Sequence, residues 1–160
     1  MARTLVLLFC LPWLAYALPQ DRDLPLDVTA DQAEFDELAG VAKYRGSVVL
    51  VQGSLRIEAQ RLTAYLNNGA VERLVAQGEQ AYFQDIPSME QGQVTGNADT
   101  IEWLLSDESM NLVGQAVLTQ AENRFSGENV TYRQSDGVIE AQGDGKQRVE
   151  MRLTPTRSEP

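Results

Sequence analysis

Three features of the sequence predict that this chain folds as one all-β domain. Apolar and polar residues alternate with a period of two through most of the chain, which is typical of strands with one buried face. Gly, Asn and Asp interrupt these runs at short intervals, and no helical pattern extends beyond about two turns. Blocks of sequence also recur at a fixed offset, which is typical of stacked supersecondary units that share a core.

The recurring blocks contain strand and turn signals. Segments 30–35 and 98–103 share the pattern Ala-Asp-x-apolar-Glu-aromatic, at an offset of 68 in the numbering (98 − 30). Segments 46–52 and 114–120 share Gly-x-x-Val-Leu-x-Gln, and the turn signal at 68–69 returns at 136–137. These signals, Asn-Gly and Asp-Gly, favour type I′ hairpins, in which both central residues have positive φ.

The alternating runs place the strands in chain order. Segment 29–35 is compatible with a helix or a strand, and its copy containing Trp103 favours a strand. Glycines such as Gly46, Gly78 and Gly114 are expected to end strands at turns. Because alternating strands leave one face wet, two layers must close over their apolar sides as a jelly roll or a sandwich, with an open edge at each end. The expected strands lie at 26–30, 48–50, 55–59, 62–66, 101–105, 130–132 and 149–153.

The N-terminal segment is typical of a secretory signal peptide. A basic start, an apolar run over 4–14 and the small-x-small triplet Ala15-Tyr16-Ala17 predict cleavage after Ala17. The run is shorter than the roughly 20 residues that span a bilayer, and Pro12 interrupts it. With the signal at 1–17 removed, we expect an exported chain that spans 18–160. Its parts are an entry segment at 18–25, one β-domain at 26–153 and a polar tail at 154–160.

Composition argues against several functions. Without Arg3 the exported chain has 12 basic and 23 acidic residues, a net charge of −11 (12 − 23). Nucleic acid is therefore not expected as a partner, since backbone binding needs clustered Lys and Arg. The chain has no His, and its one Cys, Cys10, lies in the signal, which excludes Ser-His and Cys-His nucleophiles and the usual zinc sites. We expect neither an enzyme nor a cofactor.

Two sets of charged residues remain as candidates. Asp31 and Asp99 have the chemistry of a glycosidase carboxylate pair. They occupy the same place in the two repeats, however, which favours hydrogen bonding to local backbone at turns. Arg56, Arg61 and Arg73 form either an anion site or the solvated face of strands, and the second interpretation is favoured.

The apolar inner face is open to two interpretations. Its bulky side chains either fill an ordinary sandwich core or line a groove between splayed layers that holds acyl chains. The bulky side chains are Tyr82, Phe83, Trp103, Leu105, Phe125 and Tyr132.

Short motifs follow one another in a specific order over 24–153. They are Pro25-Leu26-Asp27-Val28, Ala30-Asp31, Tyr44-Arg45-Gly46-Ser47-Val48, Gln52-Gly53-x-Leu55-x-Ile57-x-Ala59, Gly96-x-Ala98-Asp99, Gly114-x-Ala116, Gly127-Glu128-x-Val130-Thr131-Tyr132 and Gly145-Lys146-x-Arg148-Val149. The ordered set resembles the organic-solvent-tolerance (OstA-like N-terminal) domain family. A single domain behind a cleavable signal resembles the periplasmic component of that family, which also has membrane-anchored and barrel-fused members.

The resemblance implies a fold and a function. The fold is an open, twisted antiparallel β-jelly roll, built from the two repeats, with a hydrophobic inner groove. The function is to carry lipopolysaccharide from the inner to the outer membrane of the cell envelope, with the lipid A acyl chains in the groove. Domains stack head to tail, and the partners are further copies, an anchored inner-membrane transport component and the outer-membrane translocon. By position, the lipid-binding residues are Leu26, Val28, Phe83, Trp103 and Leu105.

The charges at the two ends of the domain fit such stacking. The acidic start and the basic end are complementary, which favours head-to-tail over head-to-head docking. The acidic residues are Asp21, Asp23 and Asp27, and the basic residues are Lys146, Arg148, Arg152 and Arg157. Two alternatives remain: an exported structural β-module that stacks with partners and holds no lipid, and a small glycosidase.

Overall fold

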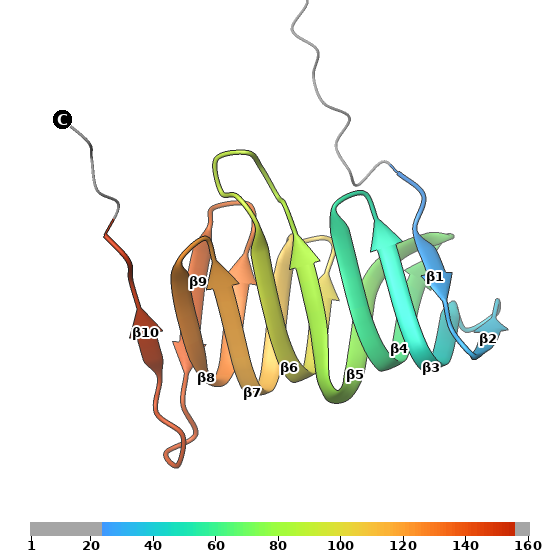
Figure 1. Ribbon diagram of the computed structural model, residues 1–160. Helices are drawn as coiled ribbons and strands as arrows, with labels where there is room; N and C mark the ends of the chain where they lie inside the picture. Colours follow the sequence, from blue (N-terminus) through green and yellow to red (C-terminus); the bar gives the residue numbers. More distant parts are fainter. Residues whose placement is uncertain (1–23, 156–160) are drawn as a thin grey trace, which may run out of the picture.

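A computed structural model describes residues 24–155, which form ten β-strands in a single antiparallel sheet (Figure 1). No helix occurs in this range, as the all-β prediction requires. The predicted signal peptide at 1–17, most of the entry segment and most of the tail lie outside the described residues. The strands are β1 (Asp27–Thr29), β2 (Gln32–Asp36), β3 (Val41–Gln52), β4 (Leu55–Asn67), β5 (Ala70–Asp85), β6 (Val94–Leu104), β7 (Ser109–Gln120), β8 (Asn123–Arg133), β9 (Val138–Gln142) and β10 (Glu150–Arg152).

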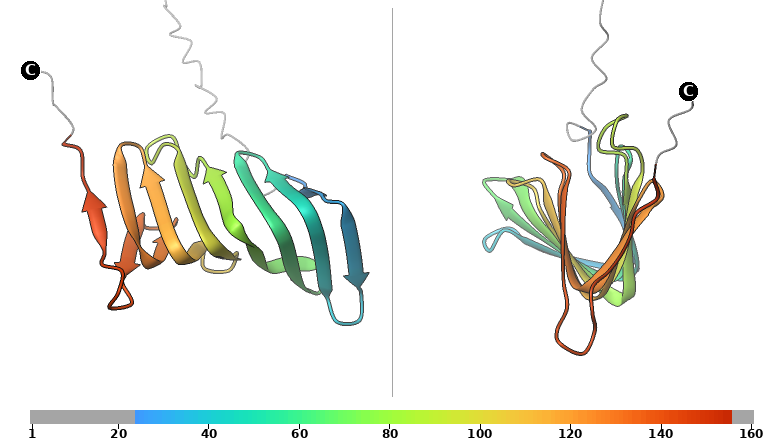
Figure 2. Two further views of the ribbon diagram at one scale, coloured as in Figure 1. Left: turned by 60° about the horizontal axis from the view of Figure 1, so that its bottom comes forward. Right: turned by 90° about the vertical axis from the view of Figure 1, so that its left-hand side faces the viewer.

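The sheet is folded lengthwise into a V, because each long strand bends near its middle (Figure 2, right). The first arm, arm one, follows the order β1-β3-β4-β5-β6-β7-β8-β10. The second arm, arm two, contains the other halves of β3 to β8, with β2 at one edge and β9 at the other. The two facing layers are therefore made by the same strands, unlike the two separate sheets of a sandwich.

Register shifts mark the bend. In β4, Leu55 and Ile57 point into the V before the shift, and Leu62 and Ala64 point into it afterwards. An extra residue in the strand changes the phase of the alternation, so that the apolar side chains remain inside on both arms. This is why the sequence shows two short runs, 55–59 and 62–66, where the structure has one strand.

Glycines at the bend lie within strands, which corrects the prediction that they end strands. Gly46 in β3 and Gly114 in β7 have φ of 79° and 82° and are followed by residues that also have positive φ. Gly78 lies within β5 near the shift between Gln77 and Ala81. A β-bulge needs such backbone conformations, and Gly adopts them without a Cβ penalty.

The two Gly-containing turn signals behave differently. Asn68 and Gly69 have φ of 51° and 82°, as the type I′ prediction requires. Of Asp136 and Gly137, only Gly137 has positive φ, so the second prediction of a type I′ turn is wrong. The β8–β9 connection is longer, and the Asp136 carboxylate closes it by accepting a hydrogen bond from the Val138 amide at 3.2 Å.

The repeat appears as equal spacing of strands. β3 begins at Val41 and β7 at Ser109, and β4 begins at Leu55 and β8 at Asn123, so both pairs have the offset of the sequence blocks. In the second repeat β6 is continuous, whereas the matching part of the first repeat forms two strands, β1 and β2, separated by residues 30–31. Segment 29–35 is therefore mostly strand, as its copy predicted, with a break at these two residues.

Candidate functional site

Two rows of apolar side chains line the inside of the V, one on each arm. Strand registry joins the members of each row from one edge of the sheet to the other. Row one, on arm one, is Val28, Leu50, Ile57, Phe83, Gly96, Leu118, Phe125 and Met151. Row two, on arm two, is Phe35, Ala42, Ala64, Leu74, Trp103, Met110, Tyr132 and Ile139.

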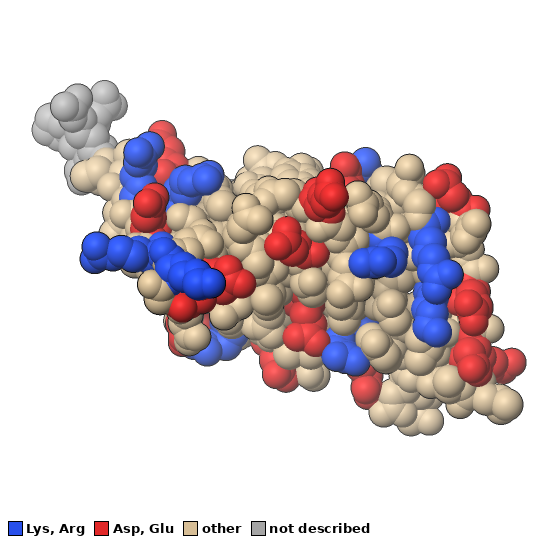
Figure 3. Space-filling view, turned by 90° about the horizontal axis from the view of Figure 1, so that it is seen from below, with Lys and Arg blue, Asp and Glu red and all other residues tan. Residues whose placement is uncertain are grey.

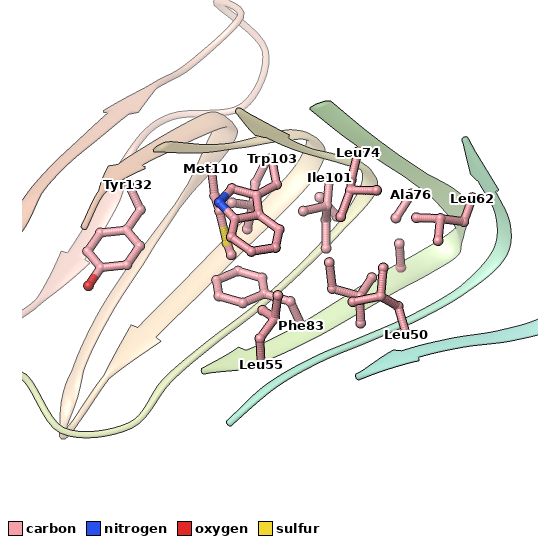
Figure 4. Packing of buried hydrophobic residues seen from close by; sticks show 14 of the residues in the cluster. Leu50, Leu55, Leu62, Leu74, Ala76, Phe83, Ile101, Trp103, Met110 and Tyr132 are labelled. Carbon is pink, nitrogen blue, oxygen red and sulfur yellow. The ribbon is translucent and has the colours of Figure 1, made fainter. Parts of the chain in front are cut away.

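The two rows meet in the middle of the molecule. The Phe83 ring, from arm one, points toward Trp103 and Met110 on arm two, and all three belong to one buried cluster (Figure 4). Phe83 is 0% exposed and Trp103 is 2% exposed, so both are fully covered by neighbouring side chains. Gly96 provides the space for Phe83, since a Cβ there would lie 2.3 Å from the Phe83 Cε1 atom.

The ends of the rows are not covered in the same way. Met151 on β10 is 56% exposed and Phe35 on β2 is 60% exposed, and Val28 is only partly buried against the core. Large exposed apolar side chains at a sheet edge are a feature that monomeric proteins usually avoid. The apolar lining of the V therefore runs to both edges and is open there.

The five predicted lipid-binding residues occupy this lining in three places. Phe83 and Trp103 are at its centre, whereas Leu26 and Val28 lie at the β1 edge, and all four belong to the core or pack against it. Leu105, just after β6, packs against the core from the upper end of arm two. The structure thus places Phe83 and Trp103 together at the centre of the V. Leu26 and Val28 lie apart from them, at the β1 edge of arm one.

Sequence reasoning missed several residues of the rows. Ile57, Leu74, Met110 and Leu118 are each at most 2% exposed and lie beside the predicted positions. The period-two pattern predicted an inward side chain at Ile57, whereas the register that places Met110 opposite Trp103 depends on the length of the turn between β6 and β7.

The charged candidates do not form a site. Asp31 and Asp99 each lie against a glycine of a neighbouring strand, and the Asp31 amide donates a hydrogen bond to the Gly46 carbonyl oxygen at 3.0 Å. Arg56 pairs with Glu58 at 2.7 Å on arm one. Arg73 pairs with Glu102 at 3.0 Å on arm two and lies 3.9 Å from the Tyr65 ring centroid. Arg56 and Arg73 therefore lie in separate ion pairs on different arms. Within 24–155 no three acidic side chains gather as metal ligands.

The outer surface carries mixed charge. Figure 3 shows acidic side chains spread over the underside of the V, with basic side chains among them and at the C-terminal end on the left. The apolar interior is the feature that distinguishes this molecule, and an elongated apolar V with open edges is a shape suited to extended ligands.

A family model described as LptA/(LptD N-terminal domain) LPS transport protein matches residues 27–138. The chain belongs to this family. A lipopolysaccharide export system protein, LptH of Pseudomonas aeruginosa, is 34% identical over 129 residues, which cover 80% of this chain and 74% of that protein. The LptA export protein of Escherichia coli K12 is 27% identical over 146 residues, covering 89% and 78% of the two chains.

The fold agrees with the family. The crystal structure of LptH, the LptA homologous periplasmic component of the lipopolysaccharide transport device from P. aeruginosa, superimposes with a TM-score of 0.78. The sequences are 29% identical in that comparison, which covers 86% of this chain and all of the other. The all-β fold with one open antiparallel sheet, which the sequence resemblance implied, is thereby confirmed. Across residues 24–155 no helix has the length and apolarity needed to cross a bilayer.

Proposed function

We propose that this chain is a periplasmic bridge component of lipopolysaccharide transport, which holds the lipid A acyl chains between row one and row two. The relatives are export system proteins for this lipid, and the LptH structure is described as a periplasmic component. The observation that carries the proposal is the pair of apolar rows that run the length of the V and end exposed at both edges.

The energetics favour acyl chains as the bound part of the lipid. Each buried CH₂ group contributes about 0.8 kcal/mol, whereas the acidic protein repels the phosphates of lipid A. The sugar-phosphate head therefore remains in solvent outside the mouth of the V. Weak attraction for the head also suits a protein that must release the lipid to the next partner.

The strand order supports head-to-tail stacking along arm one. Arm one has eight strands, each antiparallel to the next, so a copy translated along the sheet brings its β1 antiparallel to β10 of the previous copy. The inward side chains at this joint are Leu26 and Val28 on one side and Met151 on the other. Such β-augmentation makes the two apolar linings continuous.

Charge supports the same joint. Asp27 in β1 is an exposed acid. At the other end, Arg148 just before β10 and Arg152 within it are exposed bases, which outnumber Glu150 of the same strand. On arm two, by contrast, both edge strands are acidic: β2 carries Glu34 and Asp36, and β9 carries Glu140. The two edges of arm two are therefore not complementary in charge. The other acidic and basic positions at the ends, 21, 23 and 157, lie outside the described residues. The same edges are the surfaces that we assign to the anchored inner-membrane component and the outer-membrane translocon.

Fluorescence of Trp103 tests the proposal directly. Trp103 is the only tryptophan beyond residues 1–17, so its emission reports on the centre of the V. Titration with dispersed lipopolysaccharide is expected to give a saturable shift or quenching, and lipid-free core oligosaccharide is expected to give none. Trp103→Phe provides the blank for signal from the ligand itself.

A ligand-free stacking module is the second candidate, and the complete burial of Phe83 and Trp103 favours it. If lipopolysaccharide leaves the Trp103 emission unchanged and no lipid co-purifies by mass spectrometry, the second candidate is correct and the lipid-binding proposal is wrong.

A further inference from the structure

Hydrogen bonds join the two arms across the mouth of the V. Asp85 is the last residue of β5, at the upper end of arm one, and Gln134 follows β8 at the upper end of arm two. The Gln134 Nε2 atom donates to the Asp85 Oδ2 atom at 2.9 Å, and both side chains are buried, at 5% and 6% exposed. A hydrogen bond to a carboxylate is stronger than one between neutral groups, and burial shields it from competing water.

Asp85 is held firmly on its own arm. Its Oδ1 atom accepts a hydrogen bond from the Ser54 hydroxyl at 2.9 Å and another from the Ile86 amide at 2.8 Å. The carboxylate is therefore oriented by arm one and uses its second oxygen for arm two.

The β5–β6 loop adds a second connection through Gln91. The Tyr132 hydroxyl donates to the Gln91 Oε1 atom at 3.3 Å, and the Gln91 Nε2 atom donates to the Gln134 carbonyl oxygen at 3.2 Å. On the opposite arm, the Gln120 Nε2 atom donates to the Gln91 carbonyl oxygen at 3.4 Å. This loop is the yellow-green connection that rises above β5 and β6 in Figure 1.

The polar contacts lie directly over the aromatic centre of the interior. Asp85 is two residues beyond Phe83 on the same face of β5, and Gln134, just past the end of β8, is two residues beyond the buried Tyr132. An acyl chain that enters from the mouth at this position must pass between Asp85 and Gln134. The groups on both arms can bond to water once they part, so a polar seal opens more readily than an apolar one of equal area.

We infer that Asp85, Gln134 and Gln91 form a clasp that closes the mouth of the V and must open for an acyl chain to enter or leave. The inference rests on the proposed function, since it names the entrance to the same groove. The clasp keeps the apolar interior covered in the empty protein, and its opening sets the rate of lipid exchange.

A matched set of substitutions tests the clasp. Gln134→Glu keeps the size of the side chain and places a second carboxylate against Asp85, so the clasp should open at pH 9, where the two carboxylates no longer share a proton. Uptake of lipopolysaccharide, followed by Trp103 emission in a stopped-flow instrument, is expected to become about tenfold faster when this charge-assisted bond is replaced by repulsion. Gln60→Glu, on the exposed outer side of the bend, adds the same charge and should leave the rate unchanged.

A swapped pair distinguishes a clasp from a general effect on folding. In the double variant Asp85→Asn with Gln134→Glu, the Asn amide can donate to the new carboxylate, and its oxygen can still accept from Ser54 and Ile86. The slower wild-type rate should return. If the double variant remains as fast as Gln134→Glu, or if Gln134→Glu alone has no effect on a lipid-binding protein, the clasp is wrong.

A measurement without lipid separates this inference from the proposed function. Acrylamide quenching of Trp103 in the empty exported protein is expected to increase in Gln134→Glu and to return to the wild-type value in the double variant. If wild-type protein binds no lipopolysaccharide, the proposed function fails, and quenching alone then decides whether the clasp covers the interior. Equal quenching in all variants overturns the clasp.

Discussion

Gly114 shows how a single residue permits the bend on which the V depends. It has φ of 82° in the middle of β7, and a Cβ at this position would lie 2.5 Å from the Asp99 Oδ2 atom and 2.9 Å from the Asp99 Cβ atom. Gly46 has the same relation to Asp31 one repeat earlier. The repeated Asp–Gly pair is therefore explained by close packing at the bend.

Replacement of Gly114 should lower the free energy of unfolding by more than backbone strain alone explains. Gly69, in the β4–β5 turn, has the same φ of 82°, but nothing lies within 4 Å of its Cβ direction. We expect Gly69→Ala to lower the free energy of unfolding by about 1 kcal/mol through backbone strain. Gly114→Ala adds displacement of Asp99 and should lower it by about 3 kcal/mol. Urea unfolding of both variants checks this, and equal losses would show that the Asp99 contact is unimportant.

At the scale of elements, the short edge strands depend on carboxylates in their turns. The Asp144 side chain accepts hydrogen bonds from the Gln147 amide at 2.7 Å and the Lys146 amide at 2.8 Å, just before β10. These bonds lower the pKa of Asp144 below its ordinary value of 3.8. The pKa of Asp136, before β9, is likewise lowered, first by the Val138 amide and then by Arg133.

Acid should therefore loosen these turns before the long strands. Because both pKa values are lower in the folded protein, the stabilisation is fully present above the ordinary value of 3.8 and is lost as the pH falls through the folded-state pKa. In an NMR titration, the amide shifts of Lys146, Gln147 and Val138 should change with midpoints below 3.8.

Substitution identifies the carboxylate responsible in each turn. Asp144→Asn should remove the titration of Lys146 and Gln147 and leave that of Val138. Midpoints above the ordinary carboxylate value would contradict the assignment of these hydrogen bonds.

At the scale of the whole molecule, the V is closed in its middle and open at its two ends. The fully buried side chains lie on β3 to β8, whereas the exposed apolar residues Phe35 and Met151 lie on edge strands. A domain of this form gains by adding a neighbour at each edge, since pairing buries both apolar side chains and backbone hydrogen-bonding groups.

Charge reversal at one edge should weaken this association. Arg148→Glu with Arg152→Glu removes the attraction to Asp27 of the next copy, and we expect self-association to weaken about tenfold at low salt and less at high salt. Sedimentation velocity over a concentration series measures it. Arg56→Glu with Arg61→Glu changes the net charge equally on β4, away from both edges, and serves as the control. An equal effect of the two pairs would place the joint elsewhere.

The predictions from sequence succeeded where the structure is local. Alternation over Leu55-x-Ile57 and Leu62-x-Ala64 placed strands and their inner faces correctly, because successive side chains of a strand point to opposite sides. The strand β5, which has 16 residues, was not predicted as one element, because its bulge near Gly78 breaks the alternation. Gly46, Gly78 and Gly114 were interpreted as turn residues because they lie where the alternation breaks.

The sequence by itself determined the all-β class, the twofold repeat, the family and the choice of Phe83 and Trp103 as inner-face residues. Only the tertiary structure decided that these strands bend into one V, that Phe83 meets Trp103 across it, and that Asp85 joins Gln134, 49 positions away. The physical reason is that strand periodicity is a property of the local backbone, whereas the bend and its cross-arm contacts depend on bulges in register across the long strands β3 to β8.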